Sequence, residues 1–323
     1  MKGSYHVSKS NETLPAVALG TWSWGAGMAG GDQVFGNHLS EADLKPVVDR
    51  AMQNGLNLFD TAYAYGVGAS EQILGDLLKP YQRTDYVLST KFTPQMATGD
   101  NAVADMLAGS LKRLNTDYID IYWIHNPADV EKWTPALIPL VKNGQVKRVG
   151  VSNHNLAQLK RVNEILGAEG IQVSAVQNHF SLLYRSSEEA GLLDYCRDHD
   201  IDFFAYMVLE QGALSGKYNA QNPLPAGSQR AATYNKVLPQ LETLTAAMQA
   251  IGAAQDASVA EVATAYAIQK GTTPIVGVTK EKYIADEVKA SQVKLTTTEI
   301  SQLEALAAQT GINPQAAWED AMN

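Results

Sequence analysis

The sequence predicts a single domain, residues 1–323, folded as a (β/α)8 barrel. Eight short apolar runs that are rich in β-forming residues recur along the chain, and each ends in polar residues. Helix-length segments with apolar residues three and four positions apart separate most of these runs. This alternation is typical of eight parallel strands surrounded by helices, and single barrels of this length are common. A doubly wound open sheet is the alternative fold.

The predicted strands are short apolar runs that close on polar residues, as expected where parallel strands end at one edge. A small hairpin over Tyr5–Ser8, with a turn at Ser10–Asn11, is expected before the first strand. The eight barrel strands are 17–22, 57–60, 86–91, 119–125, 146–152, 173–177, 202–206 and 273–277.

The predicted helices are recognised by the spacing of their apolar residues and by their end signals. In 101–114 and 155–166 the apolar residues fall on one helical face. Ser70 is expected to cap the helix that continues through Glu71, and Gly144 to end the helix before the fifth strand. The complete set is 41–54, 70–78, 101–114, 133–143, 155–166, 188–199, 237–251, 258–269, 280–289 and a C-terminal helix at 297–308.

Segment 212–236 is the longest connection without helical or strand periodicity, and it is rich in Gly, Asn, Pro and Ser. Long loops in compact domains usually act as lids or mobile elements. We therefore expect this segment to take part in function.

Charge and cysteine content exclude several classes of function. The chain has 25 basic and 34 acidic residues, a formal charge of −9, and no basic stripe, which disfavours binding to nucleic acid or anionic membranes. Its one cysteine, Cys196, permits no internal disulfide and is expected to pack as a small apolar residue. No apolar stretch reaches the roughly 18 residues of a membrane span, and the N-terminus lacks a signal-peptide core. A cytoplasmic protein is expected.

Two patterns that often mark functional sites do not support their usual roles here. Gly25–Gly30 satisfies the glycine spacing of a dinucleotide-binding turn, but the residues after it do not begin an amphipathic helix. A flexible loop after the first strand is expected instead. None of the six histidines stands in a His-x-His pair or an HExxH motif, so no metal site is expected.

Polar residues at the ends of neighbouring strands are the best candidates for chemistry. Asp60 ends the second strand, Lys91 the third and His125 the fourth, and Tyr65 follows Asp60 after a short turn. In a parallel barrel these ends meet at one face. A buried carboxylate and a buried ammonium are each costly alone, so Asp60 is expected to pair with Lys91. A purely structural ion pair and a structural His125 are the alternatives.

The convergence of these residues suggests proton transfer by Tyr65. A free phenol titrates near about pH 10, and an ammonium stabilises the phenolate, so Lys91 is expected to lower the pKa of Tyr65. His125 is expected to hydrogen-bond a substrate oxygen and to take part in proton delivery. These roles suit protonation of a carbonyl oxygen whose carbon receives a hydride. A Schiff-base isomerase or aldolase that uses Lys91 is an alternative enzyme.

Seven motifs in order resemble those of the aldo-keto reductase superfamily over essentially the full chain. They are Gly20-Thr21-Trp22, Leu58–Gly66, Ser89–Phe92, Ile124–Pro127, Gly150–Asn153, Ala175–Gln177 and Leu214–Tyr218. The resemblance implies a catalytic tetrad without a metal. Its implied members are Tyr65 as general acid/base, Lys91 as modulator of the Tyr65 pKa, Asp60 as the partner of Lys91, and His125 as the residue that orients the carbonyl.

The resemblance also implies a nicotinamide cofactor and the residues that hold it. Ser152, Asn153 and Gln177 resemble the binders of the carboxamide, and Tyr206 the aromatic residue that stacks on the nicotinamide ring. The other implied contacts lie at the first strand end, over the pyrophosphate and near the adenosine phosphate: Thr21, Trp22, Asp60, Met207, Val208, Leu209, Gln211, Lys217, Arg230, Gly277, Thr279, Lys280, Tyr283 and Glu287.

Three departures from the family pattern concern the cofactor. Met207-Val208 replaces a usual Ser-Pro, and the residues near the adenosine phosphate lack a frequent Arg and a frequent Asn. These changes weaken the case for recognition of a 2′-phosphate, although other basic residues can supply charge. NADP(H) is favoured, with NAD(H) as the alternative. The departures are Met207, Val208, Thr279, Tyr283 and Glu287, and the basic residues are Arg230, Lys280 and Lys282.

Aromatic residues near the strand ends suggest an apolar substrate site. Such a lining suits aldehydes and small ketones better than charged sugars, although Trp123 fits a core position equally well. We therefore expect an NADPH-dependent oxidoreductase that reduces aldehydes or small ketones to alcohols. The alternative is a nicotinamide-binding regulatory subunit with little turnover, like the potassium-channel β subunits of this fold. The expected substrate contacts are Trp22, Trp24, Tyr65, Trp123 and His125.

Overall fold

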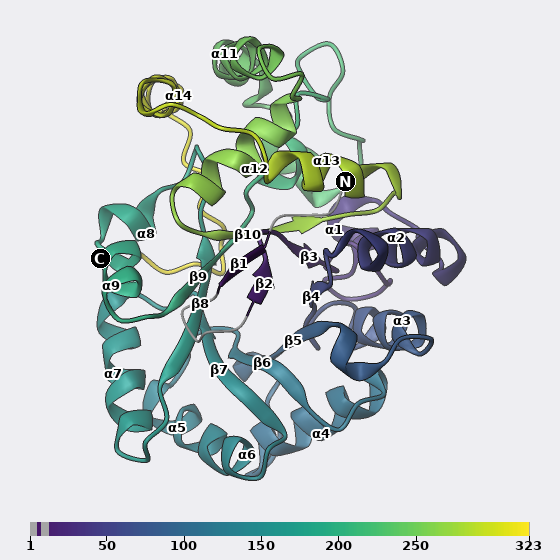
Figure 1. Cartoon of the computed structure of the whole chain (residues 1–323), viewed down its shortest axis with the longest axis vertical. Coiled ribbons are helices and arrows are strands. Elements are labelled where there is room, and N and C mark those ends of the chain that lie inside the picture. The colour runs from purple at the N-terminus through teal and green to yellow at the C-terminus, as the bar shows by residue number, and fades with distance from the viewer. Residues whose placement is uncertain (1–4, 8–12, 323) are drawn as a thin grey trace.

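Eight parallel strands close into a barrel in this computed structural model, which describes residues 5–7 and 13–322 (Figure 1). The strands follow the order β10-β3-β4-β5-β6-β7-β8-β9, and β10 also pairs with β9 to close the ring. The predicted (β/α)8 barrel is confirmed, and an open sheet is excluded. The strands are β3 (Ala18–Gly20), β4 (Leu58–Asp60), β5 (Val87–Phe92), β6 (Ile119–Ile124), β7 (Val146–Ser152), β8 (Val173–His179), β9 (Asp202–Tyr206) and β10 (Thr273–Gly277).

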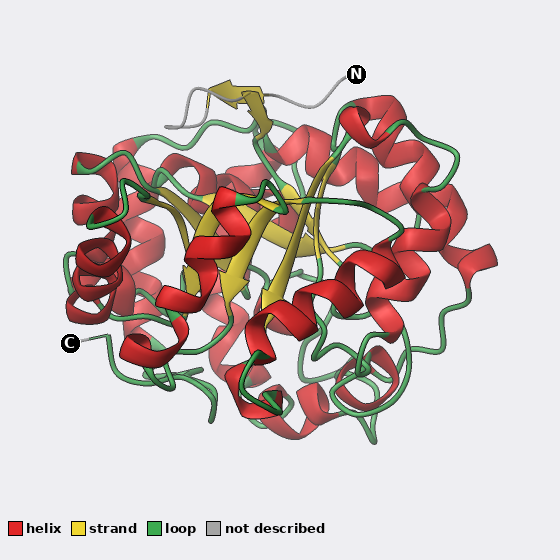
Figure 2. Cartoon of the chain, turned by 90° about the horizontal axis from the view of Figure 1, so that it is seen from below, coloured by secondary structure: helices red, strands yellow, loops and turns green. Residues whose placement is uncertain are grey.

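The parallel register brings the candidate residues to one end of the barrel. Asp60 pairs with Ser89 across β4 and β5, and the N–H of His125, just after β6, donates to the carbonyl of Phe92. In Figure 2 the strand arrowheads point toward the end where the C-terminal segment lies. The antiparallel hairpin of β1 (Tyr5–Val7) and β2 (Thr13–Pro15) lies at the opposite end. The expected hairpin is confirmed, and its turn at Ser10–Asn11 lies outside the described residues.

Helices surround the barrel, and most match the predicted ranges within two residues (Figure 1). Two short helices were not expected, α1 in the glycine-rich loop and α10 in segment 212–236. The helices are α1 (Gly31–Phe35), α2 (Glu41–Asn54), α3 (Ala69–Leu78), α4 (Ala102–Leu114), α5 (Val130–Trp133), α6 (Ile138–Lys142), α7 (Leu156–Gly167), α8 (Ser186–Glu189), α9 (Leu192–Asp198), α10 (Gln229–Tyr234), α11 (Glu242–Ala253), α12 (Val259–Gln269), α13 (Lys282–Ala290) and α14 (Thr297–Gln309).

Three predicted helices are interrupted, and the interrupting residues explain each case. The expected 133–143 helix divides into α5, a 3-10 turn that begins at Pro135, and α6, because proline lacks the N–H that a continuous helix needs. The expected 188–199 helix divides at Gly191, whose φ of 75° is left-handed. The expected 237–251 helix begins with a 3-10 turn that contains Pro239.

Helix ends follow local capping chemistry, with one predicted cap misplaced. Capping boxes begin α2 at Ser40 and α12 at Ser258. Ser70 does not cap α3: it lies inside the helix, and its hydroxyl donates to the carbonyl of Thr21. Gly144 has a φ of 82°, and its N–H donates to the carbonyl of Val141, which ends the helix before β7 as predicted.

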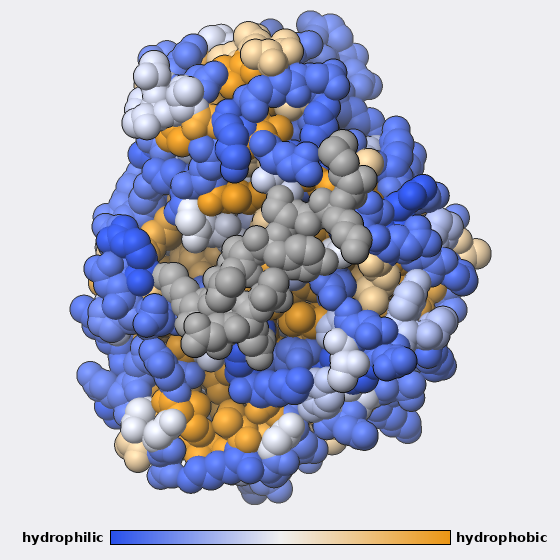
Figure 3. Space-filling view, viewed as in Figure 1, coloured by the Kyte–Doolittle hydropathy of each residue, from blue (hydrophilic) through white to orange (hydrophobic). Residues whose placement is uncertain are grey.

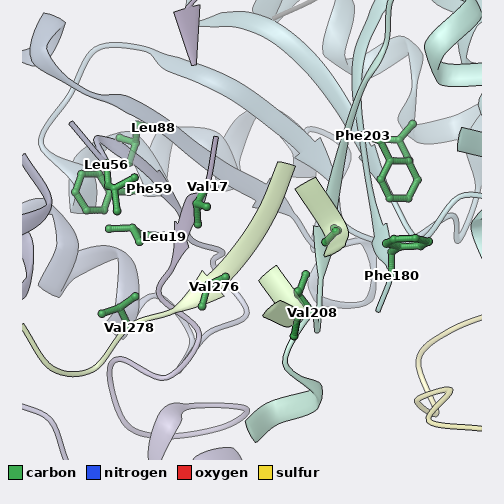
Figure 4. Close-up of a cluster of buried hydrophobic side chains, with 14 of the residues drawn as sticks. Val17, Leu19, Leu56, Phe59, Leu88, Phe180, Phe203, Val208, Val276 and Val278 are labelled. Carbon is green, nitrogen blue, oxygen red and sulfur yellow. The ribbon is translucent and has the colours of Figure 1, made fainter. Parts of the chain in front are cut away.

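Two layers of apolar side chains fill the molecule. Alternate strand residues point inward, and the inner layer consists of Leu14, Ala18, Leu58, Ile121, Trp123, Ala175 and Phe204. The outer layer packs the strands against the helices; Figure 4 shows Leu56, Phe59 and Leu88 gathered on one side and Phe180 with Phe203 on another. On the face seen in Figure 3, hydrophilic residues predominate at the rim and hydrophobic residues show between them.

None of the helices in the described ranges is both long and apolar enough to cross a bilayer.

Candidate active site

Asp60 ends β4 with its carboxylate buried and fully engaged. Its Oδ2 lies 2.6 Å from Nζ of Lys91. Its Oδ1 accepts hydrogen bonds from the hydroxyl of Ser89 at 2.5 Å and from the side-chain amide of Gln177 at 3.0 Å. Ser89 was not predicted, although it lies two residues before Lys91 on the same face of β5, as the period-two alternation of a strand indicates.

Lys91 is inaccessible to solvent, and its ammonium has a partner for each of its three hydrogens. These are Asp60, the carbonyl of Thr61 at 2.8 Å and the hydroxyl of Tyr65 at 3.3 Å. Burial lowers the pKa of Lys91. The interactions with Asp60 and Tyr65 raise this pKa by more than burial lowers it, so the net shift is upward. The predicted Asp60–Lys91 pair is confirmed, and the ammonium stays charged at neutral pH.

Tyr65 differs from the prediction in the direction of its pKa. Burial raises the pKa of the Tyr65 hydroxyl and is the largest effect, and Lys91 lowers it as expected but by less. The net shift is upward. The prediction of a lowered pKa is therefore wrong for the protein in this state, because it considered the neighbouring charge without the loss of solvation. The phenol holds its proton at neutral pH.

His125 is a neutral imidazole with one fixed nitrogen. Burial and the Lys91 ammonium lower its pKa to about 3, and its Nδ1 lies 3.1 Å from the hydroxyl of Thr93. Its ring lies edge-on to Tyr65 with the ring centres 6.1 Å apart. A neutral imidazole can hydrogen-bond a substrate oxygen, but this pKa argues against the proton delivery that we expected from His125.

A cluster of aromatic residues surrounds Trp22 beside Tyr65. Trp22 stacks on Tyr65 at 5.8 Å and meets Phe35 of α1 and Trp318 of the C-terminal segment edge-on, at 5.3 Å and 5.7 Å. Phe35 and Trp318 were not predicted, since no local spacing places them near β3. They and the predicted Trp22 form a wall at the strand ends.

Two tryptophans predicted to contact substrate are core residues instead. Trp123 is 0% exposed and lies edge-on to Phe204 in the inner layer of the barrel. Trp24 is 1% exposed, and its indole N–H donates to the carbonyl of Val278. Both predictions are wrong, because a residue near a strand end can point into the barrel or behind it as well as to the mouth.

Four predicted cofactor residues come together near the C-terminal ends of β7, β8 and β9. Asn153 adopts a left-handed φ of 61°, and its side-chain amide donates to the carbonyl of His125 at 3.0 Å. The hydroxyl of Tyr206 lies 2.6 Å from Oδ1 of Asn153. Gln177 contacts Asp60 as above, and Ser152 is buried at the end of β7. These side chains line the same face as Asp60 and Lys91.

The predicted pyrophosphate loop has a strained backbone. Met207, Glu210 and Gln211 all have positive φ, between 46° and 61°, which costs of order 1–3 kcal/mol for each such residue. Arg230 reaches over this loop from α10, and one of its guanidinium nitrogens donates to the carbonyl of Gln211 at 3.2 Å. Val208 is buried, Met207, Leu209 and Gln211 are half-buried, and Lys217 is exposed.

The remaining predicted cofactor residues divide into accessible and buried ones. Lys280 and Gly277 are exposed and Thr279 and Tyr283 are half-buried. Thr21 is buried with its hydroxyl 2.7 Å from that of Ser70. Glu287 is 5% exposed, and burial together with Asp286 and Glu261 raises its pKa to about 8. The burial of Thr21 and Glu287 does not favour contact of their side chains with a ligand.

The glycine-rich segment Gly25–Gly30 is an irregular loop after β3, as predicted, and a short helix that we did not expect follows it. Gly30 is the N-cap of α1, and Gly36 ends this five-residue helix with a left-handed φ of 71°. Gly31 packs so closely on the loop after β3 that a Cβ would lie 2.1 Å from the carbonyl oxygen of Ser23. In the described part of the chain, no group of three or more His, Cys, Asp or Glu side chains could hold a metal ion.

Comparisons with known proteins agree with this geometry. The sequence model of the Aldo/keto reductase family matches residues 16–308. A pyridoxal reductase of Arabidopsis thaliana chloroplasts is 32% identical over 309 residues, which cover 90% of this chain and 83% of that protein. An uncharacterized oxidoreductase of Mycobacterium tuberculosis is 32% identical over 288 residues, with 87% and 85% covered.

Solved structures share the fold. An aldo-keto reductase from Klebsiella pneumoniae, in complex with NADPH, is 23% identical, with a TM-score of 0.76 and coverage of 100% of this chain and 99% of that one. The family model matches most of the chain, and both relatives match it over most of their length, so the chain belongs to the aldo/keto reductase family.

Proposed function

We propose that this protein is an NADPH-dependent oxidoreductase that reduces aldehydes or small ketones to alcohols, with Tyr65 as general acid. The observation that carries the proposal is the continuous contact from Asp60 through Lys91 to Tyr65, over 2.6 Å and 3.3 Å, at the open end of the barrel. The family assignment supports the class of reaction.

Tyr65 is in the correct protonation state to donate. Its raised pKa keeps the phenol neutral at rest, and a substrate oxygen that gains negative charge becomes basic enough to take the proton. Lys91 then stabilises the phenolate that remains, and Asp60 holds Lys91 in place. The neutral imidazole of His125, which faces the same space, donates or accepts a hydrogen bond without changing charge.

The residues at the C-terminal ends of β7, β8 and β9 fit a nicotinamide cofactor. Nε of Arg230 is buried and has no hydrogen-bond partner among the described residues, as expected of a donor that would bind an anionic group of the cofactor. Asn153 and Gln177 provide amides close to the Asp60–Lys91 pair, and Tyr206 provides a ring. When bound, the cofactor supplies a hydride to the carbonyl carbon.

The preference for NADPH over NADH rests on charge. Lys280 and Lys282 are exposed next to the N-terminus of α13, where a helix end and basic side chains favour an anion such as a 2′-phosphate. The Klebsiella pneumoniae neighbour was solved with NADPH, which is consistent with this preference.

The aromatic wall around Trp22 supports an uncharged, preferably aromatic substrate. Trp22, Phe35 and Trp318 present ring faces and edges beside Tyr65, which favours flat apolar groups. The Arabidopsis relative is named for the reduction of pyridoxal, which is an aromatic aldehyde. We propose benzaldehyde-like and pyridine aldehydes as the first substrates to test.

Turnover tests the proposal directly. Oxidation of NADPH is followed at 340 nm with a panel of aromatic and aliphatic aldehydes, for the wild type and for Tyr65→Phe. We expect Tyr65→Phe to lose about 10²–10⁴-fold in kcat and to bind NADPH within a few-fold of the wild type. Near-normal reduction by Tyr65→Phe would refute the role of Tyr65. Tight NADPH binding by the wild type without turnover of any aldehyde would favour the regulatory-subunit alternative.

The single cysteine and the acidic net charge support a further part of the proposal. We place the enzyme in the cytoplasm, with a small carbonyl compound as its partner and no nucleic acid or membrane.

A further inference from the structure

The segment after α14 returns to the open end of the barrel. It has no regular secondary structure, and it brings Trp318 against Trp22 and Glu319 into the protein interior. Trp318 is 46% exposed, whereas Glu319 is only 7% exposed. We call residues 313–322 the C-terminal strap. Burial of the Glu319 carboxylate costs free energy unless another group in the interior binds it.

Glu319 of the strap is bound from two strands of the barrel. Its Oε1 accepts a hydrogen bond from the hydroxyl of Tyr206 at 2.8 Å and lies 2.9 Å from Nδ1 of His179. Its Oε2 lies 3.1 Å from the same nitrogen and accepts from the N–H of Ala316 at 3.3 Å. These contacts join residue 319 to β8 and β9, 140 and 113 positions earlier in the chain respectively.

His179 lies between two buried carboxylates. Its Nδ1 faces Glu319 and its Nε2 lies 2.9 Å from Oε1 of Glu210. Both ring nitrogens thus meet acceptors, which only the imidazolium can satisfy. Burial lowers the pKa of His179, but Glu210 and Glu319 raise it to about 9. The rings of Tyr184 and Tyr206 stack on it at 4.3 Å and 5.5 Å.

Glu210, on the other side of His179 from Glu319, is held in place by its own hydrogen bonds. It is fully buried and accepts hydrogen bonds from the hydroxyls of Ser181 and Tyr234, the latter at 2.6 Å. It also lies in the strained loop 207–211 that follows β9. The chain of contacts therefore runs from that loop through Glu210, His179 and Glu319 to Tyr206.

Tyr206 is the point where the network meets the cofactor site. Its single hydroxyl proton is shared between Oδ1 of Asn153 at 2.6 Å and Oε1 of Glu319 at 2.8 Å. Burial raises the pKa of Tyr206 well above its usual value, and Glu319 raises it further, so the group remains a hydrogen-bond donor. One face of the ring is stacked on His179, and the Tyr206 side chain is half-buried.

We propose that Glu319 is a positioning residue: it latches the C-terminal strap to His179 and sets the orientation of Tyr206, and thereby the affinity of the nicotinamide site. This inference rests on the proposed function, because Tyr206 is the ring that we place against the nicotinamide. A strap that is released exposes Tyr206 and removes Trp318 from Trp22.

Binding of NADPH to the full-length protein, measured by quenching of tryptophan fluorescence and by calorimetry, tests the proposal. We expect Glu319→Ala to weaken NADPH binding about tenfold or more, and Glu319→Gln to restore part of the loss, since its carbonyl still accepts from Tyr206. Asp320→Asn is the matched control: it changes an exposed carboxylate of the same strap and should bind NADPH like the wild type. NADPH binding of Glu319→Ala equal to the wild type would overturn the proposal.

The pH dependence separates positioning from general loss of structure. The titratable groups that face His179 are Glu210, Glu319, Tyr184 and Tyr206. As His179 loses its proton above about pH 9, the two carboxylates are no longer bridged by a cation, so wild-type affinity for NADPH should fall. His179→Gln should bind more weakly and show no such inflection. An inflection that persists in His179→Gln would contradict the assignment.

Failure of the latch and failure of the proposed function give different results. Hydrogen exchange of backbone amides in residues 313–322 reports the strap without any cofactor. Faster exchange there in Glu319→Ala than in Asp320→Asn supports the latch even if no aldehyde is reduced. Equal exchange in these two variants would refute the latch even if the wild type proves to be an active reductase.

Discussion

Lys91 on β5 and Asp60 on β4 form an ion pair of 2.6 Å whose side chains are 0% and 3% exposed. A buried ion pair stabilises a protein little more than an apolar pair of the same size does. Removal of one partner is destabilising, however, because it leaves a buried charge without a counter-ion. The position of the pair beside Tyr65, rather than its contribution to stability, explains why such a costly arrangement lies at the open end of the barrel.

Replacement of Lys91 by Met should impair both folding and chemistry. Asp60 would keep its hydrogen bonds from Ser89 and Gln177 but lose its cation, which costs about 3–5 kcal/mol of stability. Asp60→Asn combined with Lys91→Met should recover part of that stability and none of the turnover. Urea unfolding and kcat over a range of pH measure the two effects. An unchanged pH–rate profile in Lys91→Met would contradict the influence of Lys91 on the pKa of Tyr65.

Three histidines with shifted pKa values predict how stability changes with pH. The pKa of His179 is raised to about 9, so its contribution is fully present below about pH 6.5, the unfolded value, and is lost as pH rises through about 9. The pKa values of His125 and His154 are lowered to about 3 and about 4, so their contributions are lost as pH falls below about 6.5. The contribution of these three histidines to the free energy of unfolding should therefore be greatest near about pH 6.5.

Substitution of His179 isolates the alkaline limb. His179→Gln should flatten the decline in unfolding free energy between about pH 6.5 and 9, a decline of about 3 kcal/mol in the wild type. His38→Gln, at an exposed position, serves as the control and should keep the decline. The measurement is urea unfolding at half-unit steps of pH, and parallel curves for the wild type and His179→Gln would count against a charged His179.

Gly150 should tolerate no side chain because of Trp123. A Cβ at Gly150 would lie 2.1 Å from Cε3 of Trp123, so Gly150→Ala should destabilise the barrel by about 1–3 kcal/mol or more. A second change, Trp123→Leu, should recover part of this loss. Gly167→Ala is the control, since nothing lies within 4 Å of its Cβ position, and it should be neutral or stabilising by up to about 1 kcal/mol. Equal stability of Gly150→Ala and Gly167→Ala in urea would refute the core placement of Trp123.

Basic residues near α13 should determine the choice of cofactor. Removal of both ammonium groups in Lys280→Ala/Lys282→Ala should weaken NADPH binding about tenfold or more, which corresponds to about 1.4 kcal/mol. NADH, which lacks the 2′-phosphate, should bind as before. Lys160→Ala, on the exposed face of α7, should affect neither cofactor. If the double substitution weakened the binding of NADPH and NADH equally, the two lysines would not bind the 2′-phosphate.

Much of the site was predictable because it depends on strand ends. Asp60, Lys91 and His125 each follow an apolar run, and parallel strands of a barrel must end at one face. Residues that reach the site from elsewhere gave no comparable signal. Glu319 and Trp318 lie in an irregular segment after the last helix, and nothing in their local sequence indicates that the chain turns back to the barrel.

The sequence by itself determined the barrel, the order of its strands and the pairing of Asp60 with Lys91, because periodicity and charge are local properties that any compact fold must satisfy. Only the tertiary structure decided which tryptophans face the mouth, where the C-terminal strap binds, and that the pKa of Tyr65 is raised. Those properties depend on burial and on contacts between distant segments. Burial sets the cost of a charge, and it is known only once the whole chain has packed.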